Sequence, residues 1–65
     1  MYKMVEVVGT SAKGFTEAVE SAVKGLADSG EKIYWFEVVE QRGAVKESKV
    51  WEYQVKINAG VKSGK

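Results

Sequence analysis

The chain has 65 residues, ten of them basic and nine acidic, a formal charge of +1, and neither cysteine nor histidine. A single hydrophobic core gives so short a chain little stability, and disulfides, a structural metal or self-association usually add to it. Because cysteine and histidine are absent, we expect self-association and no bound metal. The balanced charge argues against binding of nucleic acid. The absence of thiol and imidazole groups argues against an enzyme. The sequence has no membrane-spanning stretch or signal peptide, which predicts a cytoplasmic protein.

The N-terminal half is predicted to form a strand and then a helix. Residues 2–8 are rich in valine and end at Gly9, which is typical of a strand closed by a turn. The hydroxyl group of Thr10 or Ser11 is expected to cap the helix N-terminus, in preference to the binding of an anion there. Gly30 follows the helix at a position suited to a left-handed C-terminal cap. The helix itself is predicted from one apolar stripe, formed by Phe15, Ala18, Val19, Ala22, Val23 and Leu26.

The C-terminal half is predicted to form two strands, residues 33–42 and 51–61, joined by a loop over residues 43–49. The last strand alternates strictly, and its odd-numbered side chains are expected to cover the helix. This parity assigns Trp51 and Tyr53 to core or rim packing rather than to ligand contact. Residues 62–65 form a polar tail that is expected to fray.

The middle strand divides less cleanly between the two faces of the sheet. Tyr34, Phe36 and Val38 are the stronger apolar set and are expected to face the helix. The opposite face then carries Trp35, Glu37, Val39 and Gln41. Residues 1–65 are thus predicted to be one α+β domain of order β-α-β-β, with a three-stranded antiparallel sheet, one helix, and one sheet face left open. Trp35 on that open face indicates an interface or a ligand site.

Four short segments occur in the order and spacing of the dodecin family, and the chain resembles dodecins over residues 3–60. The segments are Gly9-Thr10-Ser11, Trp35-Phe36-Glu37-Val38, Arg42-Gly43 and Glu52-Tyr53-Gln54-Val55. Dodecin subunits wrap their sheet around the helix, assemble into hollow spherical dodecamers and bind flavins in pairs. The resemblance implies a homododecamer that stores flavin, with Trp35 stacked on the isoalloxazine ring, able to quench its excited state, and with Gln54 at the polar edge of the ring.

The resemblance leaves the bound flavin open. FMN is the first expectation and riboflavin the alternative, with Arg42 and Lys3 as further candidate contacts. Some relatives also bind coenzyme A through basic residues, for which Arg42, Lys46, Lys49 and Lys62 are candidates here. Near its end the chain has Gly60-Val61-Lys62-Ser63, where dodecins often carry an aromatic or arginine-containing segment.

Pairing of the outward residues across the last hairpin predicts a site shared between chains. The expected register sets Glu37 opposite Lys56 and Trp35 opposite Asn58. Gln54 then lies four residues, or roughly 13 Å, from Trp35 along the sheet, which one flavin ring does not span. Each site would therefore take its tryptophan and its glutamine from different chains.

A second interpretation gives Trp35 no ligand. Tryptophan is enriched in interfaces generally, so by itself this residue favours an oligomer contact. The rival function is a structural assembly subunit without a ligand. Flavin-dependent redox catalysis is the weaker rival, because closed, paired sites leave little room for a substrate.

Overall fold

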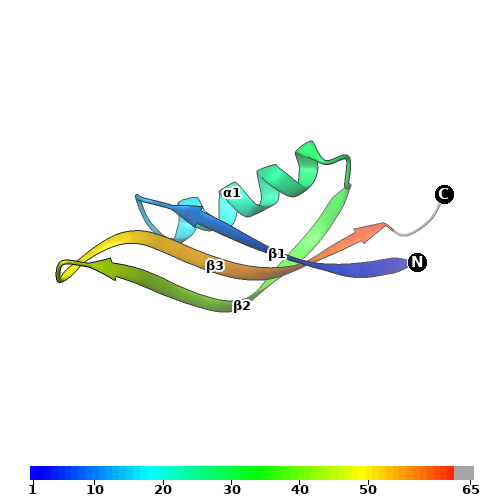
Figure 1. The fold of residues 1–65 in the computed structure, drawn as a ribbon. Coiled ribbons are helices and arrows are strands. Elements are labelled where there is room, and N and C mark those ends of the chain that lie inside the picture. Colours follow the sequence, from blue (N-terminus) through cyan, green and yellow to red (C-terminus); the bar gives the residue numbers. More distant parts are fainter. Residues whose placement is uncertain (63–65) are drawn as a thin grey trace.

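The computed structural model describes residues 1–62 as three strands and one helix in the order β-α-β-β (Figure 1). The elements are β1 (Tyr2–Ser11), α1 (Phe15–Asp28), β2 (Ile33–Lys46) and β3 (Lys49–Lys62). Both strand pairs are antiparallel, and β3 lies between β1 and β2 in the sheet. The predicted fold is therefore confirmed. The single helix of this part of the chain is too short to cross a membrane.

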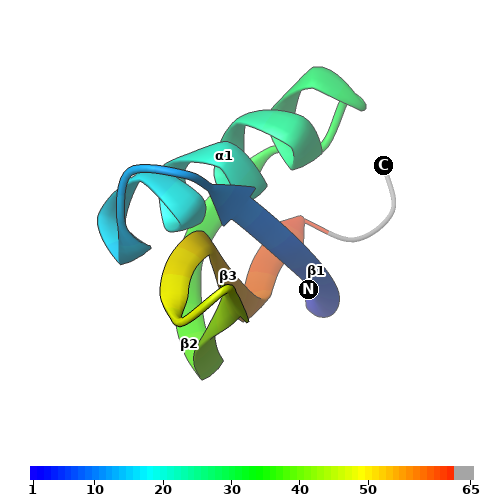
Figure 2. The ribbon, with the colours of Figure 1, turned by 60° about the vertical axis from the view of Figure 1, so that its left-hand side comes forward.

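The helix lies on one face of the sheet, where it packs mainly against β1 and β3 and touches β2 little (Figure 2). The apolar stripe predicted for the helix is confirmed, and the odd-numbered residues of β3 from Tyr53 to Val61 face it. The buried core consists of Ala18, Ala22, Leu26, Val55, Ile57, Ala59 and Val61. Because the helix covers only part of one face, residues 1–62 leave the other face and the β2 side open.

Close approach of the helix to β1 depends on Gly9. A Cβ atom at Gly9 would meet the carbonyl oxygen of Ala18 and would lie 2.7 Å from the Cβ atom of Ala22. Gly9 pairs with Val55 and so belongs to the strand, not to a turn after it. Glycine here lets the helix backbone rest directly on the sheet.

The predicted N-cap at Thr10 or Ser11 is wrong. Both residues continue the ladder of β1, where they pair with Gln54 and Tyr53, and the helix begins only at Phe15 after Gly14. The Ser11 hydroxyl oxygen instead accepts a hydrogen bond from the backbone N–H of Lys13 at 2.9 Å, which shapes the bend between strand and helix.

The predicted C-terminal cap is confirmed. Gly30 has φ 99°, in the left-handed region, and its N–H donates to the carbonyl oxygen of Ala27 at 3.0 Å. The Ser29 hydroxyl donates to the carbonyl oxygen of Leu26 at 2.6 Å. Together they satisfy carbonyl groups that the last turn of the helix leaves free.

The predicted loop over residues 43–49 is wrong, because the strands continue almost to the end of the hairpin. Lys46 pairs with Lys49, and only Glu47 and Ser48 form the turn, with φ 54° and 65°. Two positive φ values match the tight turns that suit the twist of a hairpin. Such turns favour Asn and Gly, so Glu-Ser gave no turn signal.

Three residues without a ladder partner interrupt the pairing of β2 with β3: Tyr34, Val39 and Trp51. An extra residue in one strand reverses the alternation of side chains beyond it. Gln41, which follows Val39, pairs with buried Val55 and therefore lies on the helix side of the sheet. The prediction that Gln41 lies on the open face is wrong. Tyr34 was predicted to face the helix, but its ring contacts that of Tyr2 on the other side. Phe36 and Val38 are on the helix side as predicted.

The ends of β3 also differ from expectation. Trp51, predicted for core or rim packing, is half exposed and is not in the core. Tyr53 is partly buried, and its ring and that of Phe15 form a T-shaped pair with centroids 5.0 Å apart. Lys62, predicted to begin the polar tail, is the last residue of β3. The rest of that tail, residues 63–65, lies outside the described residues.

Candidate functional site

The sheet face opposite α1, called the outer face here, carries three of the four candidate site residues. Trp35 pairs with Gly60, and Arg42 pairs with Gln54. Gly60 and Gln54 are even-numbered, so both pairs lie on the sheet face opposite the buried odd-numbered residues of β3. Lys3 pairs with buried Val61 and so has the opposite parity. The chain therefore does not place Lys3 beside Trp35 or Gln54.

Trp35 lies flat against the sheet and remains 41% exposed. A Cβ atom at Gly60 would lie 2.5 Å from Cζ2 and 2.6 Å from Cδ2 of the indole. These two atoms flank Cε2 in the six-membered ring, and similar distances to both mean that the indole turns one face to Gly60. The Tyr2 ring stands next to it in a T-shaped arrangement, with ring centroids 5.0 Å apart and planes at 71°. The other face of the indole is left open for a second flat ring.

Gly60 is a site residue that the sequence reasoning missed. Any side chain at this position would occupy the space of the indole. A glycine inside an otherwise regular strand often marks the close approach of another group, and that signal was available in the sequence.

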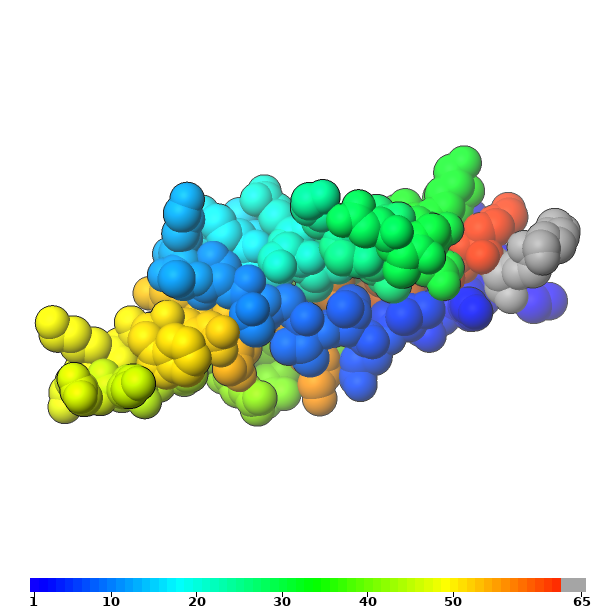
Figure 3. All heavy atoms as spheres, turned by 45° about the horizontal axis from the view of Figure 1, so that its top comes forward, coloured from blue at the N-terminus to red at the C-terminus, as the bar shows by residue number. Residues whose placement is uncertain are grey.

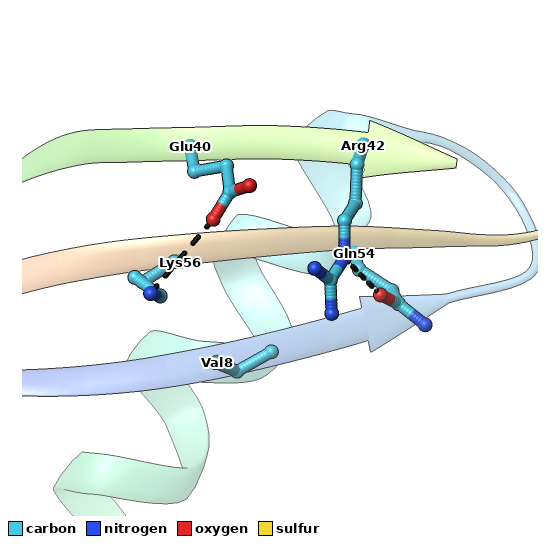
Figure 4. Close-up of a pocket in the computed structure, with 5 residues that line it drawn as sticks. All are labelled: Val8, Glu40, Arg42, Gln54 and Lys56. Carbon is cyan, nitrogen blue, oxygen red and sulfur yellow. Dashed lines mark hydrogen bonds and ion pairs between the residues drawn. The ribbon is translucent and has the colours of Figure 1, made fainter. Parts of the chain in front are cut away.

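The side-chain amide of Gln54 is held on both sides. Figure 4 shows its bond with Arg42. Arg42 Nε donates to Gln54 Oε1 at 2.6 Å, and Gln54 Nε2 donates to Glu52 Oε1 at 2.8 Å. An arginine only donates and a carboxylate only accepts, so these partners fix which way the amide points. An oriented amide can offer one donor and one acceptor side by side to a ligand.

The extra residue Val39 puts Arg42 on the outer face. Without it, the alternation that sets Trp35 outward would turn Arg42 towards the helix side. Beyond Val39, Glu40 and Arg42 both point outward, and Glu40 reaches Lys56 at 3.8 Å (Figure 4). Val8 of β1 completes the shallow pocket formed by these side chains.

The predicted register across the last hairpin is wrong by two residues. Trp35 lies opposite Gly60 rather than Asn58, and Glu37 lies opposite Asn58 rather than Lys56. The position of the turn is the reason, because Glu47 and Ser48 place its centre one residue further along the chain than the predicted register requires. Gln54 is thus six residues from Gly60 along β3, a separation of about 20 Å. Within one chain, Trp35 and Gln54 are two separate half-sites.

Basic side chains surround the Trp35 end of the outer face. The Lys62 ammonium lies 5.4 Å from the centroid of the Tyr2 ring, and that of Lys32 lies 5.7 Å from the centroid of Tyr34. The residues predicted for coenzyme A do not gather in one place: Lys46 and Lys49 flank the hairpin turn, Arg42 binds Gln54, and Lys62 ends β3.

Comparison with known proteins agrees with this geometry. The family model described as Dodecin matches residues 1–63. The dodecin of Thermus thermophilus is 42% identical over 60 residues, which cover 92% of this chain and 87% of that protein. The solved dodecin of Streptomyces coelicolor superposes with a TM-score of 0.94 at 35% identity and covers 100% of this chain and 93% of its own. That of Streptomyces davaonensis gives a TM-score of 0.94 at 28% identity, with 100% and 96% covered. The chain therefore belongs to the dodecin family.

Proposed function

We propose that this protein binds and stores flavin as a homo-oligomer, a hollow dodecamer, with the isoalloxazine ring stacked on Trp35. The observation that carries the proposal is the flat position of the indole over Gly60, which leaves one aromatic face open on a sheet face that residues 1–62 do not cover. A bound flavin would supply a flat, electron-poor ring, and such a ring stacks favourably on the electron-rich indole. Trp35 holds the ring, and no covalent or acid–base step is required of the protein.

Two copies of the chain would complete one site. Gln54 presents an oriented donor and acceptor that suit the alternating N–H and C=O groups at the polar edge of a flavin. Its distance of about 20 Å from Trp35 along the sheet means that one chain cannot offer both groups to the same ring. The tryptophan of one copy and the glutamine of another would meet where two outer faces come together.

FMN is the proposed ligand and riboflavin the alternative. Lys62 and Lys32 bring two positive charges to the end of the outer face that holds Trp35, on which the flavin would stack. A phosphate gains from a nearby ammonium group, whereas the neutral riboflavin side chain does not. We therefore expect FMN to bind more tightly than riboflavin, with a difference that shrinks as salt is added.

The test is a fluorescence titration of FMN and riboflavin with the purified wild type and with two variants. Trp35→Phe should abolish the quenching of flavin emission, and Trp35→Ala should weaken binding by about 10- to 100-fold, the range seen when an aromatic stacking partner is removed. The matched control is Trp51→Phe, which removes the other tryptophan and should leave quenching unchanged.

The structural rival predicts a different result. If wild-type protein of oligomeric mass leaves flavin emission unchanged, the protein is an assembly subunit without this ligand. If Trp35→Ala is monomeric while Trp51→Phe assembles normally, Trp35 is chiefly an interface residue.

A further inference from the structure

Gln54 lies at the point where the β2–β3 hairpin begins to extend past the helix (Figure 3). Tyr53, the preceding residue, packs against Phe15, the first residue of α1, with ring centroids 5.0 Å apart. Tyr53 stands between Glu52 and Gln54 in β3, and because side chains alternate along a strand, both of these point to the outer face. The contact with the helix therefore holds the backbone that carries Glu52 and Gln54 from the other side of the sheet.

The two partners of the Gln54 amide make one orientation of that amide much more favourable than the other. Arg42 Nε donates to Oε1 at 2.6 Å, and Glu52 Oε1 accepts from Nε2 at 2.8 Å. Both hydrogen bonds involve a charged group and are therefore stronger than bonds between neutral groups. Turning the amide over would set Nε2 against the guanidinium group, which has no acceptor, and Oε1 against the carboxylate, which has no donor. Both bonds would be lost and replaced by repulsion.

The other neighbours on the outer face do not compete for the amide within residues 1–62. Thr10 of β1 pairs with Gln54, but its hydroxyl group forms no hydrogen bond with the amide. Lys56, the next outward residue of β3, lies 3.8 Å from the carboxylate of Glu40 instead. One N–H of the amide and one lone pair of its carbonyl oxygen are thus available to a ligand.

We infer that Arg42 and Glu52 are positioning residues that make the site recognise one particular carbonyl group of the flavin ring. The inference rests on the proposed function and deepens it. The polar edge of isoalloxazine carries one N–H, at N3, between two carbonyl groups, at C2 and C4. Oε1 of Gln54 can accept from this N–H while Nε2 donates to only one of the carbonyl groups. Because Nε2 is held on the Glu52 side, the carbonyl group on that side is used and the other is not.

The fixed amide has a consequence for ligand specificity. An amide without charged partners could turn over and use whichever carbonyl group is the better acceptor. A fixed amide cannot, so a flavin altered at the selected carbonyl group loses one hydrogen bond, whereas alteration at the other has little effect. Loss of one hydrogen bond to a ligand lowers its affinity by about tenfold.

The test compares two flavin analogues, in which sulfur replaces the oxygen at C2 or at C4, by absorbance titration of the wild type and of variants. Sulfur is a weak hydrogen-bond acceptor, so the two analogues should bind to the wild type with affinities that differ by about tenfold. Arg42→Met with Glu52→Met releases the amide and should bring the two affinities to within about twofold of each other. Glu52→Gln keeps an acceptor for Nε2 and should preserve the wild-type difference.

The matched control is Lys24→Met with Asp28→Met, which removes one positive and one negative side chain from an exposed ion pair on the helix. This control should bind both analogues as the wild type does. Arg42→Glu with Glu52→Arg exchanges the donor and the acceptor and should reverse which analogue binds more tightly. A wild type that binds both analogues equally, or a double methionine variant that keeps the wild-type difference, would overturn the inference.

Unmodified FMN separates this inference from the proposed function. If the wild type quenches FMN emission but binds both analogues equally, flavin storage stands and only the role of Arg42 and Glu52 is overturned. If unmodified flavin does not bind at all, both proposals are overturned. The double methionine variant should still quench FMN emission, because Trp35 is unchanged. The charge-exchanged variant, which keeps the composition of the site, gives the same comparison if the methionine variant does not fold.

Discussion

The contact between Trp35 and Gly60 links a feature of one residue to the chemistry proposed for the site. A glycine in a strand usually only weakens it, but at Gly60 the absence of a Cβ atom leaves the space in which the indole lies against the backbone. The open ring face depends on this space, because an indole lifted at one edge no longer presents a plane parallel to the sheet.

Gly60→Ala should therefore impair flavin binding more than folding. The new methyl group would push the indole away, and Trp35 is exposed enough to swing outward at little cost. We expect flavin affinity to fall by at least about tenfold, in line with the loss of one stacking contact, while circular dichroism stays unchanged. Gly43→Ala is the control, since a Cβ atom there meets nothing nearer than 3.5 Å. Equal affinities for both variants would contradict the role assigned to Gly60.

At the scale of the elements, the close packing of α1 on β1 makes two glycines respond in opposite ways to the same substitution. Gly9→Ala should destabilise the fold by about 2–3 kcal/mol, because the added methyl group meets helix backbone that has no room to move. Gly25→Ala, in the exposed part of the helix with nothing within 4 Å, should stabilise it by about 0.5–1 kcal/mol. Urea unfolding at one fixed protein concentration measures both changes, and two shifts of the same sign would refute this account.

The hairpin turn offers a gain in stability. Glu47 and Ser48 hold left-handed φ values that cost a residue with a side chain about 1–2 kcal/mol each. Replacing them by Asn and Gly, the pair that such turns prefer, should raise the free energy of unfolding by about 1–2 kcal/mol. The urea midpoint should move upward with an unchanged slope, and Ser48→Ala should give no gain. A midpoint that does not move would mean that the turn is not strained.

The order and type of the elements followed from the sequence, and so did the parity of Trp35 and Gln54. Periodicity carries this information directly, as the apolar stripe of the helix and the alternation of β3 show. The turn, the register and the face of Arg42 could not be predicted in the same way. A Glu-Ser turn has no compositional signal, and the unpaired Val39 lies in a run of valines and glutamates that contains no breaker. Only the three-dimensional pairing with β3 shows where the alternation reverses.

At the scale of the whole molecule, the chain has little interior of its own. Three of its seven buried hydrophobic residues are alanines, while Tyr34, Trp35, Phe36 and Trp51 are each more than 40% exposed among residues 1–62. Small cores contribute only a few kcal/mol, and assembly is a usual source of further stability. The exposed aromatic groups lie on the outer face, on the helix side of β2 and near the hairpin turn, which fits a subunit with more than one kind of neighbour.

Thermal stability should therefore depend on protein concentration. If unfolding is coupled to dissociation, each tenfold dilution changes the free energy per subunit by about 1 kcal/mol and should lower the melting temperature by about 5 °C. Differential scanning fluorimetry over three decades of concentration measures the slope. A melting temperature that does not change on dilution would show that the isolated subunit is stable by itself.

The paired interruptions at Val39 and Trp51 have a consequence for how this hairpin can change. Each adds one residue to its own strand, so the shift introduced at Trp51 is cancelled at Val39 and the rungs on either side keep step. The alternation of outward side chains in β2 thus reverses at Val39. The segment before it carries Trp35 on the outer face, and the segment after it carries Arg42 there, opposite Gln54. A deletion of Val39 alone would leave the two segments unable to keep their outward residues together. Val39 therefore constrains the sequence of this hairpin, although it is not one of the candidate site residues.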